Sequence, residues 1–290
     1  MIRTLLRSGA VFGLLAAGAP LKSQAQGEPS WRAVELSRQL RDTLPQRVRV
    51  QYGAGRVDVR GTADPLLYSM HLRYDEARTI PLHRYDADQH AVVLGVEGRG
   101  AGGIRSTGRG EESGELRLML PSAVPLDLDL EFGGTEAALE LGGLALRSLR
   151  MDFGATEATL GFASPNRAQM AELEINVGAA GLTATRLANA NANRLRVRGG
   201  VGSVDLDFGG HWSRDLDVVT RLAVGKLTLR IPPDVGLRLE VQRVAAGFNH
   251  VGLVKRDDAW YTPNYDTAPH KLRVRAETFF GGIDVLLSAP

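Results

Sequence analysis

The chain has 290 residues, no cysteine, 34 glycines, 43% hydrophobic and 23% charged residues, and a formal net charge of +2. The absence of cysteine excludes a disulfide scaffold, thiolate metal sites and cysteine catalysis, and the balance of hydrophobic and charged residues excludes a disordered chain. The length suits one large domain or two small ones, with ample area for a hydrophobic core.

Residues 1–25 have the features of a secretory signal peptide. Two arginines precede an apolar run at residues 9–19, which is too short to span a bilayer as a helix, and Ser23 and Ala25 supply small residues at positions −3 and −1 of a cleavage site. We expect cleavage after Ala25 and an exported mature chain, residues 26–290, in the periplasm or in the extracellular part of the cell envelope. An uncleaved anchor and a buried N-terminal helix are the alternatives.

Removal of this segment changes the charge of the protein. It contains Arg3, Arg7 and Lys22 and no acid, so the mature chain carries 32 basic and 33 acidic residues and a formal net charge of −1. A near-neutral chain gives no support for nucleic-acid binding through a broad positive surface. No other stretch reaches 18 apolar residues, so we expect no transmembrane segment after cleavage.

The N-terminal part of the mature chain alternates between apolar and polar residues, as half-buried strands do. A helix from Trp31 to Leu40 is the weaker alternative for the first of these segments. A glycine-rich corner at residues 53–55 separates two halves of one long strand. The strands are expected at residues 34–40, 48–52, 57–60, 66–74, 79–84 and 89–96.

Residues 98–114 interrupt the alternation with seven glycines, and we expect a flexible loop within one continuous domain. Its first six residues, Gly98 to Gly103, satisfy the G-x-G-x-x-G pattern of dinucleotide sites. Such a site requires a helix that begins at the third glycine, and the residues that follow have no apolar period. The sequence therefore favours the loop over a nucleotide site.

From residue 126 a unit of strand, small-residue corner and strand recurs at intervals of 21 to 24 residues. The corners lie at Gly133, Gly154, Gly178, Gly200 and Ala223. A blurred copy surrounds residues 246–248, and a last copy at 272–287 closes the chain. A fixed period without a helical half indicates an all-β fold, a single-stranded β-solenoid with about 22–23 residues per rung and two strands in each rung.

Stacking of these copies predicts columns of equivalent residues about 4.8 Å apart. The inward columns are apolar: Leu128, Leu149, Leu173 and Leu195, then Leu130, Met151, Ile175 and Val197. One outward column alternates in charge: Asp129, Arg150, Glu174 and Arg196. The next is less regular, with two adjacent acids: Glu131, Asp152, Asn176 and Arg198. Opposite charges on neighbouring strands stabilise such a stack.

Acidic residues, in one case together with a histidine, supply the candidates for metal binding or catalysis. Asp86, Asp88 and His90 would share one face of a strand and suit a hard metal or acid–base cluster, but a solvated turn is the more ordinary interpretation. The pairs Asp127 and Asp129, and Asp205 and Asp207, resemble the paired carboxylates of β-helix glycan hydrolases and lyases. Alternating acids also solvate a sheet, so we assign no catalytic, cofactor or metal residue.

An aromatic cluster near the C-terminus contains Trp260, Tyr261 and Tyr265. Exposed aromatic rings can stack on sugars. We favour a loop that caps the end of the solenoid core and protects its unpaired edge.

The segment YGAGRVDV (52–59) and the closing stretch 259–287, an aromatic loop followed by a strand, a glycine corner and a last strand, carry a resemblance to a known family. The chain over roughly 46–290 resembles toastrack-type β-solenoid domains, which occur in LiaF-like cell-envelope stress proteins and in bacterial "putative adhesin" domains of unknown function. The resemblance supplies no catalytic residues. The chain departs from the LiaF-like proteins because its sequence offers no transmembrane helix.

Two classes of function follow. The first is an exported, non-enzymatic scaffold, adhesion or sensing module that binds an envelope protein or glycan through its surface, without a cofactor. The second is a polysaccharide-acting hydrolase or lyase on a β-helix. A cluster of three acids on one sheet beside a cleft would favour the enzyme, and the scattered acids of the sequence favour the binding module.

Overall fold

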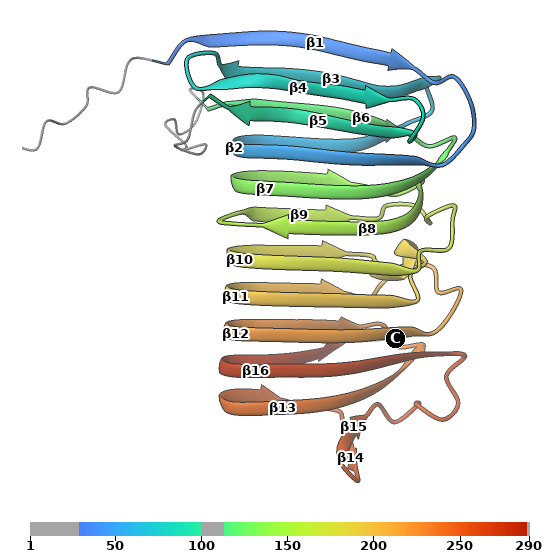
Figure 1. Ribbon diagram of the computed structural model, residues 1–290. Coiled ribbons are helices and arrows are strands. Elements are labelled where there is room, and N and C mark those ends of the chain that lie inside the picture. The colour runs from blue at the N-terminus through green and yellow to red at the C-terminus, as the bar shows by residue number, and fades with distance from the viewer. Residues whose placement is uncertain (1–28, 100–112, 289–290) are drawn as a thin grey trace, which may run out of the picture.

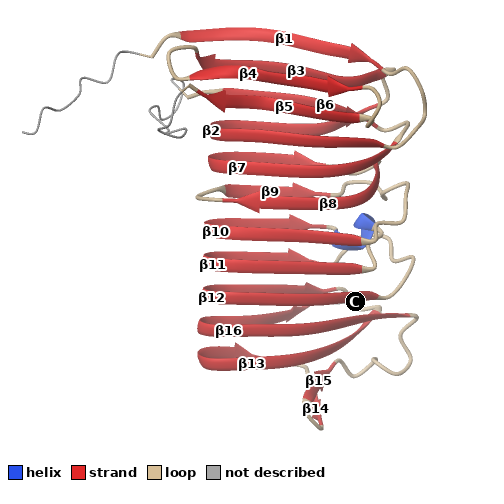
Figure 2. Ribbon diagram, in the orientation of Figure 1, coloured by secondary structure: helices blue, strands red, loops and turns tan. Residues whose placement is uncertain are grey.

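The computed structural model describes residues 29–99 and 113–288, and these residues form an all-β solenoid (Figure 1). Figure 2 shows strands stacked along almost the whole molecule and one short 3-10 helix beside them. The predicted signal peptide lies outside the described residues, as does the predicted flexible loop apart from its first two and last two residues. The elements in chain order are β1 (Trp31–Gln39), β2 (Gln46–Thr62), β3 (Leu66–Asp75), β4 (Thr79–Asp86), β5 (Ala91–Gly98), β6 (Glu115–Pro121), β7 (Pro125–Glu140), β8 (Ala145–Phe153), β9 (Glu157–Gly161), β10 (Glu172–Thr185), η2 (Leu187–Ala190), β11 (Arg194–Asp207), β12 (Leu216–Ile231), β13 (Val235–Asn249), β14 (Val254–Arg256), β15 (Ala259–Tyr261) and β16 (His270–Leu287).

Each rung is one long strand that bends at a small-residue corner, or two strands that meet there. The first halves of the rungs stack into one parallel sheet and the second halves into another, so inward side chains of both sheets form one core. Alternation places every second residue in this core, as in β7, where Leu128 and Leu130 are buried between exposed or half-buried acids. The all-β solenoid expected from the sequence is therefore confirmed.

The predicted register is also confirmed. Asp129 lies opposite Arg150, Arg150 opposite Glu174, and Glu174 opposite Arg196. The leucine column follows the same register, and its four side chains are at most 2% exposed. One ion pair differs from the backbone register. Arg196 lies opposite Glu174 but pairs with Glu172, at 3.0 Å, and Glu174 pairs with Arg198 instead.

The order of the rungs differs from chain order at both ends of the stack. At the N-terminal end, β5 and β6 together form a rung outside β2: β5 pairs with the first half of β2 and β6 with its second half. Antiparallel strands cover this rung, because β3 pairs with β6, β1 with β3, and β4 with β5. The segment from Trp31 is thus a strand, and the helix alternative is wrong.

At the C-terminal end, the last repeat does not close the stack. The strand β16 lies between β12 and β13 and pairs in parallel with both (Figure 1). Charge explains this order, because ion pairs join β12 to β16: Arg273 to Asp217 at 2.6 Å, Arg221 to Glu277 at 2.9 Å, and Lys226 to Asp284 at 2.8 Å. If β13 took the place of β16 beside β12 in the same register, Gln242 would replace Glu277 and Asn249 would replace Asp284, and these two ion pairs would be lost.

The aromatic segment covers the outer edge of β13, as predicted. The short strand β15 pairs with Arg238 and Leu239 of β13, and Trp260 packs against Phe248 and His250, with ring centroids 5.4 and 4.0 Å apart. Tyr261 lies edge-on to Tyr265. Trp260, Tyr261 and Tyr265 are half-buried in the cap. Among the described residues, no helix is long and apolar enough to cross a membrane.

Candidate functional site

A groove follows the corner of the stack, and we call it the glycine groove after its floor, Gly53, Gly133, Gly154, Gly178 and Gly200. It consists of two hollows of about 510 and 670 Å³, which meet at Asp152. The smaller hollow begins under β4, at Leu82 and Arg84, and the larger one ends at Phe279 on β16. Six rung-to-rung steps from β2 to β16 give a length of roughly 29 Å.

The floor is open because the glycines lack side chains and lie against one another. A Cβ on Gly133 would meet the carbonyl oxygen of Gly53 at 2.2 Å, and a Cβ on Gly178 would meet that of Gly154 at 2.8 Å. In the rungs from β7 to β11 the close approach of the backbones therefore requires glycine, and the missing side chains leave a groove on the outer face. The sequence showed this glycine column, which we interpreted as corners only.

One wall of the groove is a polar column, two residues before the corner in each rung. Its upper part is acidic, at Glu131 and Asp152, and its lower part is basic, at Arg198 and Arg221. Gln51, Asn176 and Glu277 complete it. An elongated ligand in the groove would therefore meet hydrogen-bonding groups at every rung and a change of charge along its length.

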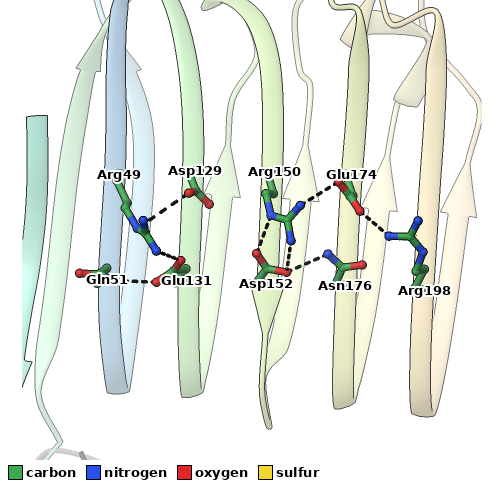
Figure 3. A network of polar contacts seen from close by, with 9 residues as sticks. All are labelled: Arg49, Gln51, Asp129, Glu131, Arg150, Asp152, Glu174, Asn176 and Arg198. Atoms are coloured by element: carbon green, nitrogen blue, oxygen red, sulfur yellow. Dashed lines mark hydrogen bonds and ion pairs between the residues drawn. The ribbon is translucent and has the colours of Figure 1, made fainter. Parts of the chain in front are cut away.

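Above the groove, the outward columns form a network of polar contacts in two groups, one on β2 and β7 and the other on β8, β10 and β11 (Figure 3). Arg49 contacts Glu131 and lies 3.8 Å from Asp129, and Gln51 donates to Glu131 at 2.7 Å. Arg150 donates to Asp152 at 2.8 Å and to Glu174 at 3.0 Å. The amide of Asn176 donates to Asp152 at 2.7 Å, and Arg198 completes the series by pairing with Glu174.

Asp129 is the least satisfied member of this network. Among the described residues its buried Oδ1 atom has no hydrogen-bond partner. Burial raises the pKa of Asp129, and Glu131 and Asp152 act in the same direction, whereas Arg49 and Arg150 oppose them. Arg150 has a raised pKa of its own, chiefly because its guanidinium donates to Asp152.

Carboxylate oxygens of Asp129, Glu131 and Asp152 lie within 4.8 Å of one another. Hard cations such as Ca²⁺ prefer oxygen ligands of this kind. Here the guanidinium groups of Arg49 and Arg150 already contact Glu131 and Asp152 and supply the compensating charge. The cluster can thus serve as an ion-pair network, and its three acids also lie on one sheet beside a cleft.

The structure separates the other acids that the sequence singled out. Asp127 pairs with Arg147, Asp205 pairs with Arg230 at 2.7 Å, and Asp207 accepts the backbone N–H of Gly209 at 2.9 Å. Neither pair of acids proposed from the sequence belongs as a pair to the three-acid cluster, which contains Asp129 alone of those four residues. Reasoning from the sequence missed the real cluster, whose signal was the two adjacent acids Glu131 and Asp152 in one predicted column.

The segment from Asp86 to His90 is a turn, as the ordinary interpretation expected. The carboxylate of Asp86 accepts the backbone N–H groups of Asp88 and Gln89, each at 3.0 Å. His90 adopts a positive φ of 47° and lies 4.0 Å from Asp42. The glycine motif at 98–103 falls almost entirely outside the described residues.

Comparisons with solved structures find β-rich bacterial proteins. A "putative cell adhesion protein" from Clostridium sporogenes has 17% identity and a TM-score of 0.43, and the match covers 90% of this chain and 100% of that one. A "putative adhesin" from Bacteroides fragilis has 9% identity and a TM-score of 0.40, with 89% and 99% covered. A "putative adhesin" from Parabacteroides merdae has 11% identity and a TM-score of 0.33, with 90% and 97% covered. Among curated proteins, no match is found.

A family model gives the clearer relationship. The model of the N-terminal domain of toast_rack, DUF2154, matches residues 32–183 and 166–230. The two matches overlap and together span more than half of the chain, from within β1 to within β12. The resemblance to toastrack-type domains noted from the sequence is therefore confirmed, and the chain belongs to the family of toast_rack N-terminal domains.

Proposed function

We propose that this protein is an exported, non-enzymatic β-solenoid module of the cell envelope, which binds an extended segment of an envelope protein or glycan in the glycine groove. The observation that supports this most directly is the groove itself: an open groove with a floor of glycine over five rungs and a polar wall that repeats at every rung. Its length of roughly 29 Å would accommodate about eight or nine residues of an extended peptide.

A non-enzymatic role fits the electrostatics of the site. Catalytic acids and bases need pKa values tuned to proton transfer and a site shielded from water. Glu131 and Asp152 contact arginines, and the groove is open along the outer face. Such groups suit recognition of a partner's polar atoms better than proton transfer.

The test is a variant that fills the groove without disturbing the fold. Ala223 continues the glycine column and is exposed, and the next rung carries Phe279 at the equivalent place. Ala223→Trp is therefore expected to fold normally and to obstruct the larger hollow. Ser203→Trp, on the exposed outer face of the second sheet in β11, is the matched control.

Both variants and the unchanged protein are expressed in the native host, crosslinked in intact cells and isolated from the envelope. We expect one discrete crosslinked species, lost with Ala223→Trp and retained with Ser203→Trp. Retention of the same species in both variants would refute binding in the groove.

One observation favours a second candidate, a polysaccharide hydrolase or lyase. Asp129, with its raised pKa, lies beside Glu131 and Asp152 on one sheet next to a cleft, and an acid–carboxylate pair is the arrangement that glycosidases use. Incubation with a panel of envelope glycans distinguishes the two candidates. We expect no cleavage, whereas sugar release that Asp129→Asn abolishes would support the enzyme.

Export is tested by the intact mass of the protein recovered from its native host. Cleavage after Ala25 predicts a mature chain that begins at Gln26 and carries a net charge of −1. A recovered species that keeps residues 1–25 would contradict the proposed signal peptide.

A further inference from the structure

The corner of the stack changes character along its length. Equivalent corner positions carry small residues in the upper rungs and large apolar residues in the lower ones. From β2 to β13 the stacked pairs are Gly53-Ala54, Gly133-Gly134, Gly154-Ala155, Gly178-Ala179, Gly200-Val201, Ala223-Val224, Phe279-Phe280 and Val244-Ala245. The large residues therefore gather on four consecutive rungs, β11, β12, β16 and β13, whose bends lie at the left in the lower half of Figure 1.

These side chains are exposed and adjacent. Val201 lies opposite Val224, Val224 opposite Phe280, and Phe279 is next to Phe280 in the chain. With Val244 they make up what we call the apolar edge, and each of the five residues is between 43% and 73% exposed. Apolar residues scattered singly over a surface are ordinary, but a contiguous exposed row of them indicates an interaction site.

Folding does not account for the apolar edge. The upper rungs turn the same corner with glycine and alanine, so the stack needs no large side chain there. Core packing does not use these residues either, because the buried core contains none of the five. Exposed phenylalanine and valine oppose solubility, so their presence points to a surface that is covered in use.

Cations border the apolar edge on both sheets. Arg198 and Arg221 lie on one side and Lys226 on the other, and each is more exposed than its acidic partner, Glu174, Glu277 or Asp284. Arg243, beside Val244, donates to the carbonyl of Ala246 at 2.6 Å and forms no ion pair within the described part of the chain. The border thus carries one uncompensated positive charge, and its paired cations are more accessible to a ligand than the acids that pair with them.

From this arrangement we infer that the apolar edge docks the protein on a lipid bilayer with anionic headgroups. Phenylalanine and valine side chains enter the interface between headgroups and acyl chains, while arginine and lysine contact the anionic headgroups. The small extent of the row favours a bilayer over a protein partner, because five side chains over four rungs can insert into a fluid interface but bury little area against a rigid surface.

The position-specific test uses the full chain with a fluorescent probe at the edge. Phe280→Trp keeps a large apolar side chain at the edge, and Leu44→Trp places the same probe at an equally exposed apolar position far from it. Both are mixed with vesicles of equal parts phosphatidylglycerol and brominated phosphatidylcholine. We expect more quenching of tryptophan fluorescence with the probe at position 280 than with the probe at position 44, because only the apolar edge enters the bilayer. The native tryptophans are common to both proteins, so the difference between them reports on the probe alone.

A binding measurement complements the probe. Phe280→Ser combined with Val224→Ser removes apolar area but leaves every residue that lines the larger hollow, so it spares the proposed partner binding. We expect sedimentation with the same anionic vesicles to weaken about tenfold or more, while Leu44→Ser binds as the unchanged protein does and both variants keep the original melting temperature.

Three results would overturn the inference. Equal quenching at positions 280 and 44 would mean that the edge has no special contact with lipid. Unchanged sedimentation of the double serine variant would mean that adsorption is electrostatic only. A concentration-dependent dimer that this variant abolishes, without quenching at position 280, would assign the apolar edge to a second copy of the chain instead.

Discussion

At Asp129, burial and the neighbouring acids raise the pKa of the carboxyl group, and the neighbouring arginines lower it. The carboxylate is partly buried among acids, its Oδ1 atom has no partner among the described residues, and its pKa is raised. In the folded state the carboxylate binds a proton more tightly than in the unfolded state. Its ionised form therefore reduces stability at neutral pH, and this reduction disappears as the pH falls through the folded-state pKa.

Asp129→Asn imitates the protonated form and should stabilise the protein at neutral pH by about 0.2–1 kcal/mol, since the Asp129 side chain is 34% exposed and solvent partly screens it. The gain should vanish on acidification. Urea unfolding at several pH values measures it, with Asp127→Asn as control, because Asp127 accepts bonds from Arg147 and Ser148 and its loss should destabilise. A destabilising Asp129→Asn would contradict this account of the network.

The glycine floor makes a second prediction for single residues. Gly178→Ala would bring a Cβ within 2.8 Å of the Gly154 carbonyl oxygen, whereas at Gly134 the nearest atom to a new Cβ is 4.0 Å away. Gly178→Ala should cost about 1–3 kcal/mol of unfolding free energy, and Gly134→Ala about 0.5 kcal/mol or less. Thermal melts of the two variants provide the comparison, and equal effects would mean that stacking does not demand glycine in the floor.

At the scale of strands, Arg150 joins two neighbouring rungs by an ion pair and lies opposite an acid of a third. Its guanidinium contacts Asp152 on its own strand and Glu174 on the next, and Asp129 lies opposite on the previous one. Arg150→Glu should cost about 1–2 kcal/mol, because it removes both contacts and adds like-charge neighbours.

Arg150→Gln removes the contacts without the repulsion and should cost clearly less. Added salt should narrow the difference between the two variants, because it screens repulsion between exposed charges. Urea unfolding at low and high salt measures both effects. Equal costs at every salt concentration would show that Arg150 acts through packing alone.

Most strands and their register were predictable from the sequence, because alternation fixes which face is buried and the repeats align their own columns. Leu128, Leu149 and Leu173 illustrate this, since each is buried in the predicted register. The acid cluster was only half visible: the column showed Glu131 beside Asp152, but the approach of Asp129 depends on side-chain conformation. The groove was not predicted, because the sequence shows a column of glycines but does not show that their missing side chains leave a hollow on the outer face.

At the scale of the whole molecule, the order of the rungs was beyond the sequence. Similar repeats can pair in more than one order, and the decision rests on a few long-range ion pairs such as that of Arg221 with Glu277. The repeat period likewise could not show that β5 and β6, from segments on either side of residues 99–114, form one rung outside β2.

Engineered cysteines test this order, since the chain has none of its own. Val219→Cys with Arg275→Cys places two thiols at paired positions of β12 and β16, about 4.8 Å apart at the backbone. Val219→Cys with Glu240→Cys joins β12 to β13, at about twice that distance. Mild oxidation should link the first pair and leave the second free. A disulfide in the second pair would place β13 directly on β12.

The central claim is that a partner occupies the glycine groove, and site-specific crosslinking in living cells tests it most directly. A photoreactive amino acid with an aliphatic side chain no larger than leucine, too small to fill the hollow as tryptophan would, is placed at Ala223 in the groove and, separately, at Ser203 on the opposite sheet of the same region. We predict a discrete crosslinked partner from position 223 and none from position 203. The same products from both positions, or products from position 203 alone, would contradict the claim.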